Sequence, residues 1–390
     1  MPPVTPEMSA VGVVELVVGG AVTVLGLTDL FLTVFNYDGF TFVAGRYQRY
    51  VWHALRALSR LAPGRARPAA LSLSSAGLLP ATVALWLAME TVGFGFLYAA
   101  GLSTHGFAVT HGVGRDLGGA LYLSAGVITT LSFGDVIAVG GVWRALVDVE
   151  AMVGLATFTL SIGYVVTTFG ILGDLDRLHN TVRRHADRPQ RPSSVLVRHY
   201  RGGSPTELPD LLQVLATSLE SYDEGLRRYP VAYYFHTRRV ERSVPRVFLT
   251  LGELLALVRW GLVADDPMRD DPWLAALLEQ YSTTLRRLQH SFVGPVPMSP
   301  APVIDEPAFA DAYRADVSVD PHVAAFRDMQ GRTRSATGAP MPPDPDIDLV
   351  YRRYSEWAEF THARDTVLRR ISAHLGYDWA DMADGLRPST

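Results

Sequence analysis

Seven consecutive residues, Thr129-Thr130-Leu131-Ser132-Phe133-Gly134-Asp135, have the types and the order that could hold a cation by backbone oxygens. They follow a short apolar segment, Gly119 to Ile128, and precede a long hydrophobic run that begins near Val142. A half-helix that enters a membrane and ends in a loop of Thr, Gly and aromatic residues can aim backbone carbonyls at a permeating ion. The pattern therefore predicts a re-entrant helix followed by an ion-coordinating loop.

This loop resembles the filter of the potassium-channel pore family, which reads Thr-x-Gly-Tyr/Phe-Gly-Asp. Thr130, Phe133, Gly134 and Asp135 match that pattern, and Ser132 stands where the family has its first Gly. The resemblance covers about residues 77 to 175. The preceding segment is similar to a bacterial subgroup of single-pore channels with an extra leading helix.

The resemblance implies a role for each loop residue, with potassium as the permeant ion and no cofactor. The expected filter consists of the Thr130 hydroxyl and carbonyl, the carbonyls of Leu131, Ser132 and Phe133, and Gly134, which allows the unusual backbone. The expected supports of the filter are Asp135, Thr129 and Glu90. Gly154 stands where the family keeps its hinge glycine, and Gly163 follows on the same helix. Glycines permit bending or close packing, so both interpretations remain open.

Ser132 is the informative departure from the family pattern. Successive carbonyls face one axis only if the backbone alternates between right- and left-handed regions, and an L-residue pays about 1 kcal/mol or more for the left-handed one. We therefore expect weaker potassium selectivity than the family norm. Phe133 also lacks the commoner Tyr hydroxyl, and Tyr122 and Leu123 stand where many relatives carry the paired tryptophans that receive it.

Composition limits the function classes. The 390 residues have a formal charge of -4, 19% charged residues and a mean hydropathy of +0.14. These values fit a chain that is part membrane-embedded and part soluble, and they predict no nucleic-acid partner. The absence of cysteine from the sequence excludes disulfides and thiolate chemistry. No Ser/His/Asp or metal-ligand pattern rises above chance spacing, so we expect no enzyme activity.

Three apolar runs are long enough to cross a bilayer: 11–35, 77–100 and 142–172. Glu15 and Asp29 lie near the ends of the first run, and Glu90 lies near the middle of the second. A lone carboxylate there should face protein; it either braces the pore loop, senses protons, or bonds a neighbouring helix. Residues 1–8 contain no basic residue, so we expect no cleaved signal peptide.

The arginines predict the topology. The segment between the first two runs contains a single acid, Asp38, against Arg46, Arg49, Arg56, Arg60, Arg65 and Arg67. This excess marks a cytoplasmic segment. We therefore expect a multi-pass protein of the plasma membrane, with its N-terminus outside and its C-terminal domain in the cytoplasm. In the same segment Val51, Trp52, Leu55, Leu58 and Leu61 recur at helical spacing. This indicates either an amphipathic helix on the inner membrane face or a packed connector.

The short helix before the loop is predicted over Leu117 to Thr129, with Asp116 as its N-cap. Its C-terminal end would favour a cation in a central cavity. One chain supplies one filter strand, so four chains must meet on an axis, and we expect a C4 homotetramer in the lipid bilayer. His105 and His111 in the preceding loop either confer external pH sensitivity or are ordinary exposed residues.

The fold class is therefore an all-α membrane protein with three transmembrane helices and a re-entrant helix. The expected domains are an N-terminal span (1–36), a basic linker (37–76), a pore domain (77–175) and a cytoplasmic helical domain (176–390). In the last domain we expect helices over 210–229, 245–262, 272–292 and 351–375. No nucleotide-binding motif follows residue 175, which leaves tetramer assembly, gating and an unidentified regulatory ligand. The aromatic run Tyr229 to His236 predicts core or interface packing, or a ligand pocket.

Three functions remain open from the sequence. The first is a potassium channel gated by an unknown cytoplasmic input. The second is a weakly selective monovalent cation channel, which Ser132 favours. The third is a non-conducting membrane scaffold or receptor that keeps the channel-like fold and acts through its C-terminal half.

Overall fold

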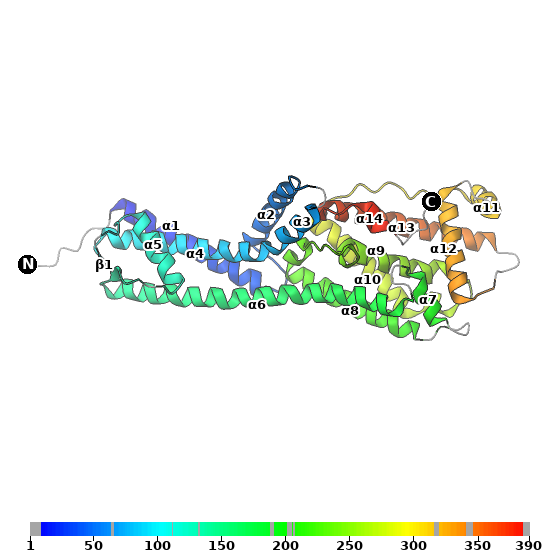
Figure 1. The fold of residues 1–390 in the computed structure, drawn as a ribbon, viewed down its shortest axis with the longest axis horizontal. Coiled ribbons are helices and arrows are strands. Elements are labelled where there is room, and N and C mark those ends of the chain that lie inside the picture. The colour runs from blue at the N-terminus through cyan, green and yellow to red at the C-terminus, as the bar shows by residue number, and fades with distance from the viewer. Residues whose placement is uncertain are drawn as a thin grey trace, which may run out of the picture. The chain divides into compact units, whose positions relative to one another are not determined.

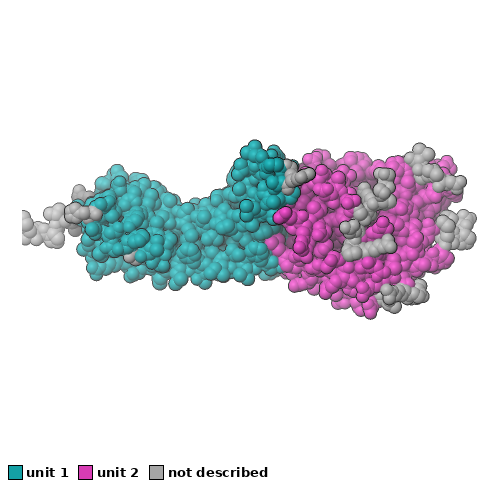
Figure 2. Space-filling model, viewed as in Figure 1, with its two compact units in different colours: residues 1–170, 226–235 teal, residues 171–225, 236–390 magenta. Residues whose placement is uncertain are grey.

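The computed structural model is mostly helical and divides into two compact units (Figures 1 and 2). The described residues are 9–63, 66–110, 112–131, 133–187, 191–200, 205, 207–315, 320–340 and 346–384. Unit 1 comprises residues 1–170 and 226–235, and unit 2 comprises residues 171–225 and 236–390. Each unit is described here by itself.

In the part of the chain that the structure describes, three helices are long and apolar enough to cross a membrane. These helices contain the three predicted runs. The first is α1 (Ala10–Phe35) and the third is α6 (Gly141–His185). The second, Arg67–Ser103, consists of α3 (Arg67–Ala76) followed by α4 (Leu78–Ser103). α6 continues 13 residues past the predicted end at 172, and its residues from 171 onward belong to unit 2.

Glycines allow α1 and α4 to approach closely. A Cβ on Gly19 of α1 would lie 2.6 Å from the carbonyl oxygen of Gly93, and a Cβ on Gly93 of α4 would lie 2.3 Å from the hydroxyl of Thr23. Small residues are the usual means of bringing helix backbones together in a membrane. This contact fixes α1 against α4.

Two short strands lie on either side of α5 (Leu117–Ile128) in the chain. β1 (Phe107–Val109) pairs antiparallel with β2 (Val136–Ala138), in the register Phe107 to Ala138. The prediction of a mainly helical fold is confirmed; it did not include these strands, because three-residue strands are too short to show an alternating pattern. Phe107 packs against Tyr98 and Trp143, with ring centroids 5.5 and 5.6 Å apart, so the pair is part of a hydrophobic core.

The basic linker folds into α2 (Ala44–Ser59) and α3. Asp29, fully buried at the end of α1, accepts backbone N–H groups from Phe42 (2.9 Å), Val43 (2.7 Å) and Ala44 (3.1 Å), so it caps the start of α2. The same carboxylate also accepts the indole N–H of Trp86 of α4, at 3.0 Å. One carboxylate therefore joins α1, α2 and α4.

Of the two interpretations of α2, the structure favours the packed connector for the middle of the helix. Trp52 is fully buried, with its ring 5.8 Å from that of Tyr234. Gln48 donates to the hydroxyls of Thr82 (3.1 Å) and Tyr164 (2.9 Å), which lie on α4 and α6. The middle of α2 is thus packed into unit 1.

Ten residues far along the chain, 226–235, belong to unit 1. We call residues 226–235 the aromatic strap. It includes the 3₁₀ turn η1 (Pro230–Tyr234). The Tyr229 hydroxyl donates to the Val34 carbonyl at 2.9 Å, and its ring lies 5.8 Å from that of Tyr164. Phe235 contacts Phe169 of α6 at the same centroid distance. The prediction that this aromatic run packs in a core is confirmed.

Unit 2 is built from helices that continue after α6. They are α7 (Ser193–His199), α8 (Leu208–Arg228, whose last three residues enter unit 1), η2 (Val240–Arg242), α9 (Val244–Ala256), the π-helical turn η3 (Leu257–Gly261), η4 (Pro267–Asp270), α10 (Pro272–Leu288), the π-helical turn η5 (Gln289–Val293), α11 (Glu306–Arg314), α12 (Pro321–Thr337), α13 (Ile347–Leu375) and α14 (Trp379–Ala383). The four predicted helices correspond to α8, α9 with η3, α10 with η5, and α13. In the core Arg364 is almost wholly buried and pairs with Glu253 at 2.7 Å.

Candidate functional site

The helix before the candidate filter begins where the sequence predicts. The Asp116 carboxylate accepts the backbone N–H of Gly119 at 3.0 Å, so the predicted N-cap of α5 is confirmed. The 12 residues of α5 span about 18 Å at 1.5 Å per residue, too short to cross a hydrocarbon core of about 30 Å. α5 ends one residue before the predicted end, with Thr129 as its C-cap.

The chain leaves α5 through a Schellman-type turn. The N–H of Thr130 bonds to the Val127 carbonyl at 2.9 Å, and the N–H of Leu131 bonds to the Gly126 carbonyl at 2.8 Å. Thr130 has φ of +60°, the left-handed region that costs an L-residue roughly 1–2 kcal/mol. The candidate filter therefore starts at a strained threonine. Ser132, where the sequence predicts strain, lies outside the described residues.

The end of the loop is tied to α5 and to the loop before it. The Tyr122 hydroxyl donates to the Asp135 carboxylate at 2.8 Å, and the Tyr122 ring stacks on Phe133 with centroids 5.9 Å apart and planes 9° apart. The Asp135 carbonyl accepts the N–H of Thr110 at 2.8 Å. Gly134 has φ of +80°, which glycine adopts freely. Asp135 is thus fixed through its side chain and its backbone.

Buried carboxylates lie behind α5. Glu150 of α6 accepts the Tyr98 hydroxyl of α4 at 2.5 Å and the Ser124 hydroxyl of α5. Glu90, expected as a support of the filter, accepts instead the Thr157 hydroxyl of α6, at 2.8 and 3.0 Å to its two oxygens. The carboxylate that braces α5 is therefore Glu150, which sequence reasoning missed. Its signal was the same as that of Glu90: an acid inside a long apolar run.

The two candidate hinge glycines differ in their surroundings. A Cβ on Gly154 would lie 2.4 Å from the Ile128 carbonyl oxygen, so the last turn of α5 rests directly on α6 there. A Cβ on Gly163 would have nothing within 4 Å. Gly154 is a close-packing position in this structure, whereas Gly163 is free of steric constraint.

The remaining loop side chains face outward or back to the helix. Leu131 and Phe133 are 62% and 64% exposed, and the Thr129 hydroxyl bonds the Ala125 carbonyl. Behind the loop lies a hollow of about 220 Å³, lined by residues of α5, the loop, β2 and Val147 of α6. The structure thus brings Thr129 to Leu131 and Phe133 to Asp135 together at one end of α5, with Glu90, Gly154 and Gly163 along the neighbouring helices.

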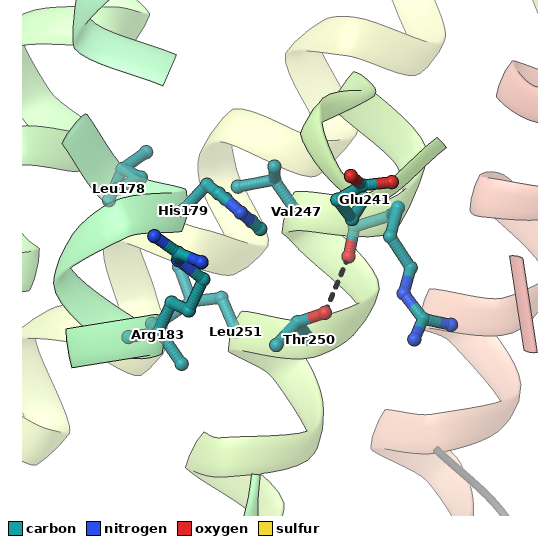
Figure 3. Close-up of a pocket in the computed structure, with 9 residues that line it drawn as sticks. Leu178, His179, Arg183, Glu241, Val247, Thr250 and Leu251 are labelled. Atoms are coloured by element: carbon teal, nitrogen blue, oxygen red, sulfur yellow. Dashed lines mark hydrogen bonds between the residues drawn. The ribbon is translucent and has the colours of Figure 1, made fainter. Parts of the chain in front are cut away.

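A second hollow lies within unit 2 (Figure 3). His179 and Arg183 of α6 face Val247 and Leu251 of α9 across it, and Glu241 lies at its edge. Its volume is about 40 Å³, room for one or two water molecules, whereas small-molecule sites usually measure about 300–1,000 Å³. As it stands, this hollow does not accommodate an organic ligand.

The chain is similar to a bacterial membrane protein. The uncharacterized membrane protein YdjJ of Bacillus subtilis strain 168 is 20% identical over 193 residues, which are 49% of this chain and 55% of that protein. The chain spans about half the length of the curated relative that it matches. It matches no protein-family model and no solved structure. With its three long apolar helices, the chain is a membrane protein.

Proposed function

We propose that four copies of this chain form a cation channel that passes potassium passively through the backbone carbonyls of Thr130 to Gly134. The observation that carries the proposal is the fixed end of the loop: Asp135 is held by the Tyr122 hydroxyl at 2.8 Å and by the Thr110 amide at 2.8 Å. A filter must keep its oxygens in place while ions pass. The channel lies in the plasma membrane, with its N-terminus outside, and an unidentified cytoplasmic input gates it.

Backbone carbonyls suit this task because they replace the hydration shell of a cation without a full negative charge. A ring of carboxylates would bind the ion too tightly for rapid release, whereas carbonyl dipoles balance entry against exit. One chain supplies one strand of such a site. The shortness of α5 supports a re-entrant position, because its end then lies at membrane depth and not on the far side.

A face of α6 supports the assembly of several copies. This face is apolar and exposed in the single chain. The opposite face of α6, which carries Glu150, Gly154 and Thr157, is buried. The large members of the exposed face, 44–66% exposed and at helical spacing, are Val149, Met152, Leu155, Ile162 and Val166. A second copy of the chain covers this face and the hollow behind the loop in the proposed tetramer.

Ion flux from purified protein in liposomes tests the proposal. We expect potassium flux from the wild type and a tetramer by native mass spectrometry. Gly134→Ala should abolish flux, because φ of +80° disfavours alanine. Gly20→Ala is the matched control, since its Cβ has nothing within 4 Å. A monomer or dimer in lipid, or full flux from Gly134→Ala, would contradict the proposal.

The selectivity of the channel has a separate test at Ser132. Replacing this serine by glycine restores the family pattern, so Ser132→Gly should raise the permeability of potassium relative to sodium. Reversal potentials of the two proteins in mixed potassium and sodium solutions measure the ratio. Identical ratios would show that Ser132 does not weaken selectivity.

A further inference from the structure

The hairpin of α2 and α3 joins two long apolar helices, and a connection between two successive membrane spans lies at one surface of the membrane. The hairpin joins Phe35, the last residue of α1, to Leu78, the first residue of α4, and both of these helices are long enough to span a bilayer. Asp29 fixes the start of α2 by accepting three backbone N–H groups. Figure 1 shows α2 rising at an angle from the α1 and α4 pair, and α3 leading back into α4.

This hairpin exposes apolar side chains near the end of α2 and along α3. The middle of α2 is packed into unit 1 through Gln48 and Trp52, but Leu58 and Leu61 beyond it are 62% and 81% exposed. Leu73 of α3 is 77% exposed. Leucines that protrude from a segment at the membrane surface gain free energy by entering the boundary between headgroups and acyl chains.

Arginines accompany these leucines. Arg56 and Arg60 are one helical turn apart at the end of α2, and burial, with the positive charges of Arg60 and Arg67, lowers the pKa of Arg56. Neither Arg60 nor Arg67 has an acidic partner in the described part of the chain. The Nε atom of Arg67 is buried there without a hydrogen-bond partner. A guanidinium cluster of this kind matches the geometry and the charge of a phosphate group.

We propose that the tip of the α2–α3 hairpin binds the phosphate headgroup of an anionic lipid in the adjoining leaflet. Arg60 and Arg67 contact the phosphate, and Leu58, Leu61 and Leu73 lie among the upper acyl chains. The leucines favour a lipid over a free anion in solution, because a free anion would leave them in water. The site requires membrane insertion only and does not depend on ion conduction.

Lipid titration of the full-length protein in detergent tests the charge. Dioleoylphosphatidylglycerol should raise the melting temperature, and dioleoylphosphatidylcholine should not. The double variant Arg60→Gln/Arg67→Gln should need about 25-fold more of the anionic lipid for half of the effect, since each arginine near an anionic surface contributes about five-fold. The charge-matched control Arg238→Gln/Arg370→Gln alters two exposed arginines of unit 2 and should titrate like the wild type. Unchanged titration of the first variant, or equal stabilisation by sodium phosphate, would overturn the proposal.

A spin label tests the position of the tip without altering the arginines. The chain contains no cysteine, so Leu61→Cys gives a single labelled site. In phosphatidylglycerol vesicles the label should be accessible to oxygen, like a reference label at Val24→Cys of α1. The second reference is a label at Val214→Cys of α8. If the label at position 61 collides with a water-soluble nickel chelate as often as this reference does, Leu61 lies in water and the site is refuted. Val24 and Val214 are 64% and 49% exposed.

Discussion

Replacing Gly154 by alanine should push the last turn of α5 away from α6. The new Cβ would lie 2.4 Å from the Ile128 carbonyl oxygen and 2.9 Å from its Cγ1 atom, so the oxygen must move by about 1 Å to reach an ordinary contact distance. Overpacking of this kind costs about 1–3 kcal/mol. The displaced turn leads directly into Thr129 to Asp135, so we expect potassium flux to fall together with stability.

Gly163→Ala is the matched comparison on the same helix. Alanine is favoured over glycine by about 1 kcal/mol in a helix interior, and both variants gain this amount. Since nothing lies within 4 Å of a Cβ on Gly163, the difference between the two variants isolates the overpacking cost, about 2 kcal/mol. With an unfolding entropy of about 2.1 cal/mol/K per residue, this cost corresponds in a 390-residue chain to melting temperatures about 2–3 °C apart.

Thermal melts of the purified full-length variants in one detergent measure this difference, and liposome flux measures its consequence. If Gly154→Ala melts at or above Gly163→Ala, α5 does not rest on α6 as the structure describes. If Gly163→Ala melts higher than the wild type but conducts less, Gly163 is the hinge.

Three further predictions concern polar contacts of unit 1. Tyr122→Phe keeps the stack on the loop but removes the hydroxyl from Asp135, so potassium flux should decay faster during prolonged recording; an unchanged time course would remove the tether from the proposed filter. Glu150→Ala leaves the buried Tyr98 hydroxyl without its carboxylate acceptor, at about 1–3 kcal/mol, whereas the Ser124 hydroxyl keeps the Thr91 carbonyl at 3.0 Å; Glu150→Gln should restore much of the lost melting temperature, and equal losses from both would argue against the Tyr98 bond. Asp29→Ala removes the cap of α2, at about 0.5–2 kcal/mol, and should raise amide hydrogen exchange at the start of that helix; unaltered exchange would show that the cap is not needed.

The sequence predicts the parts of the fold that have long, local patterns. Apolar runs locate α1, α4 and α6, because a membrane helix needs about 20 apolar residues in a row. Asp116 locates the start of α5, because an N-cap acts on the next turn of the chain. The loop motif likewise identifies Asp135 as a tether, and the structure supplies Tyr122 as its partner.

Contacts between distant residues could not be predicted in the same way. Glu150 meets Tyr98 across 52 positions of the chain, and no local pattern records that pairing. Asp29 was placed near a membrane surface from its position in an apolar run, but its role as the cap of α2 depends on a turn 13 residues later. α12 has a polar and only weakly periodic sequence, and it was not predicted for that reason.

The aromatic strap affects how this protein can be divided. Residues 226–235 fill space beside Trp52, Tyr164 and Phe169, yet they are encoded more than 50 positions after the last of them. A protein truncated just beyond α6 would therefore have a cavity where these residues pack, and the Val34 carbonyl would lose its hydrogen bond from the Tyr229 hydroxyl. Transplanting residues 77–175 into a different membrane protein would require this decapeptide as well, although it lies after α6 in the sequence.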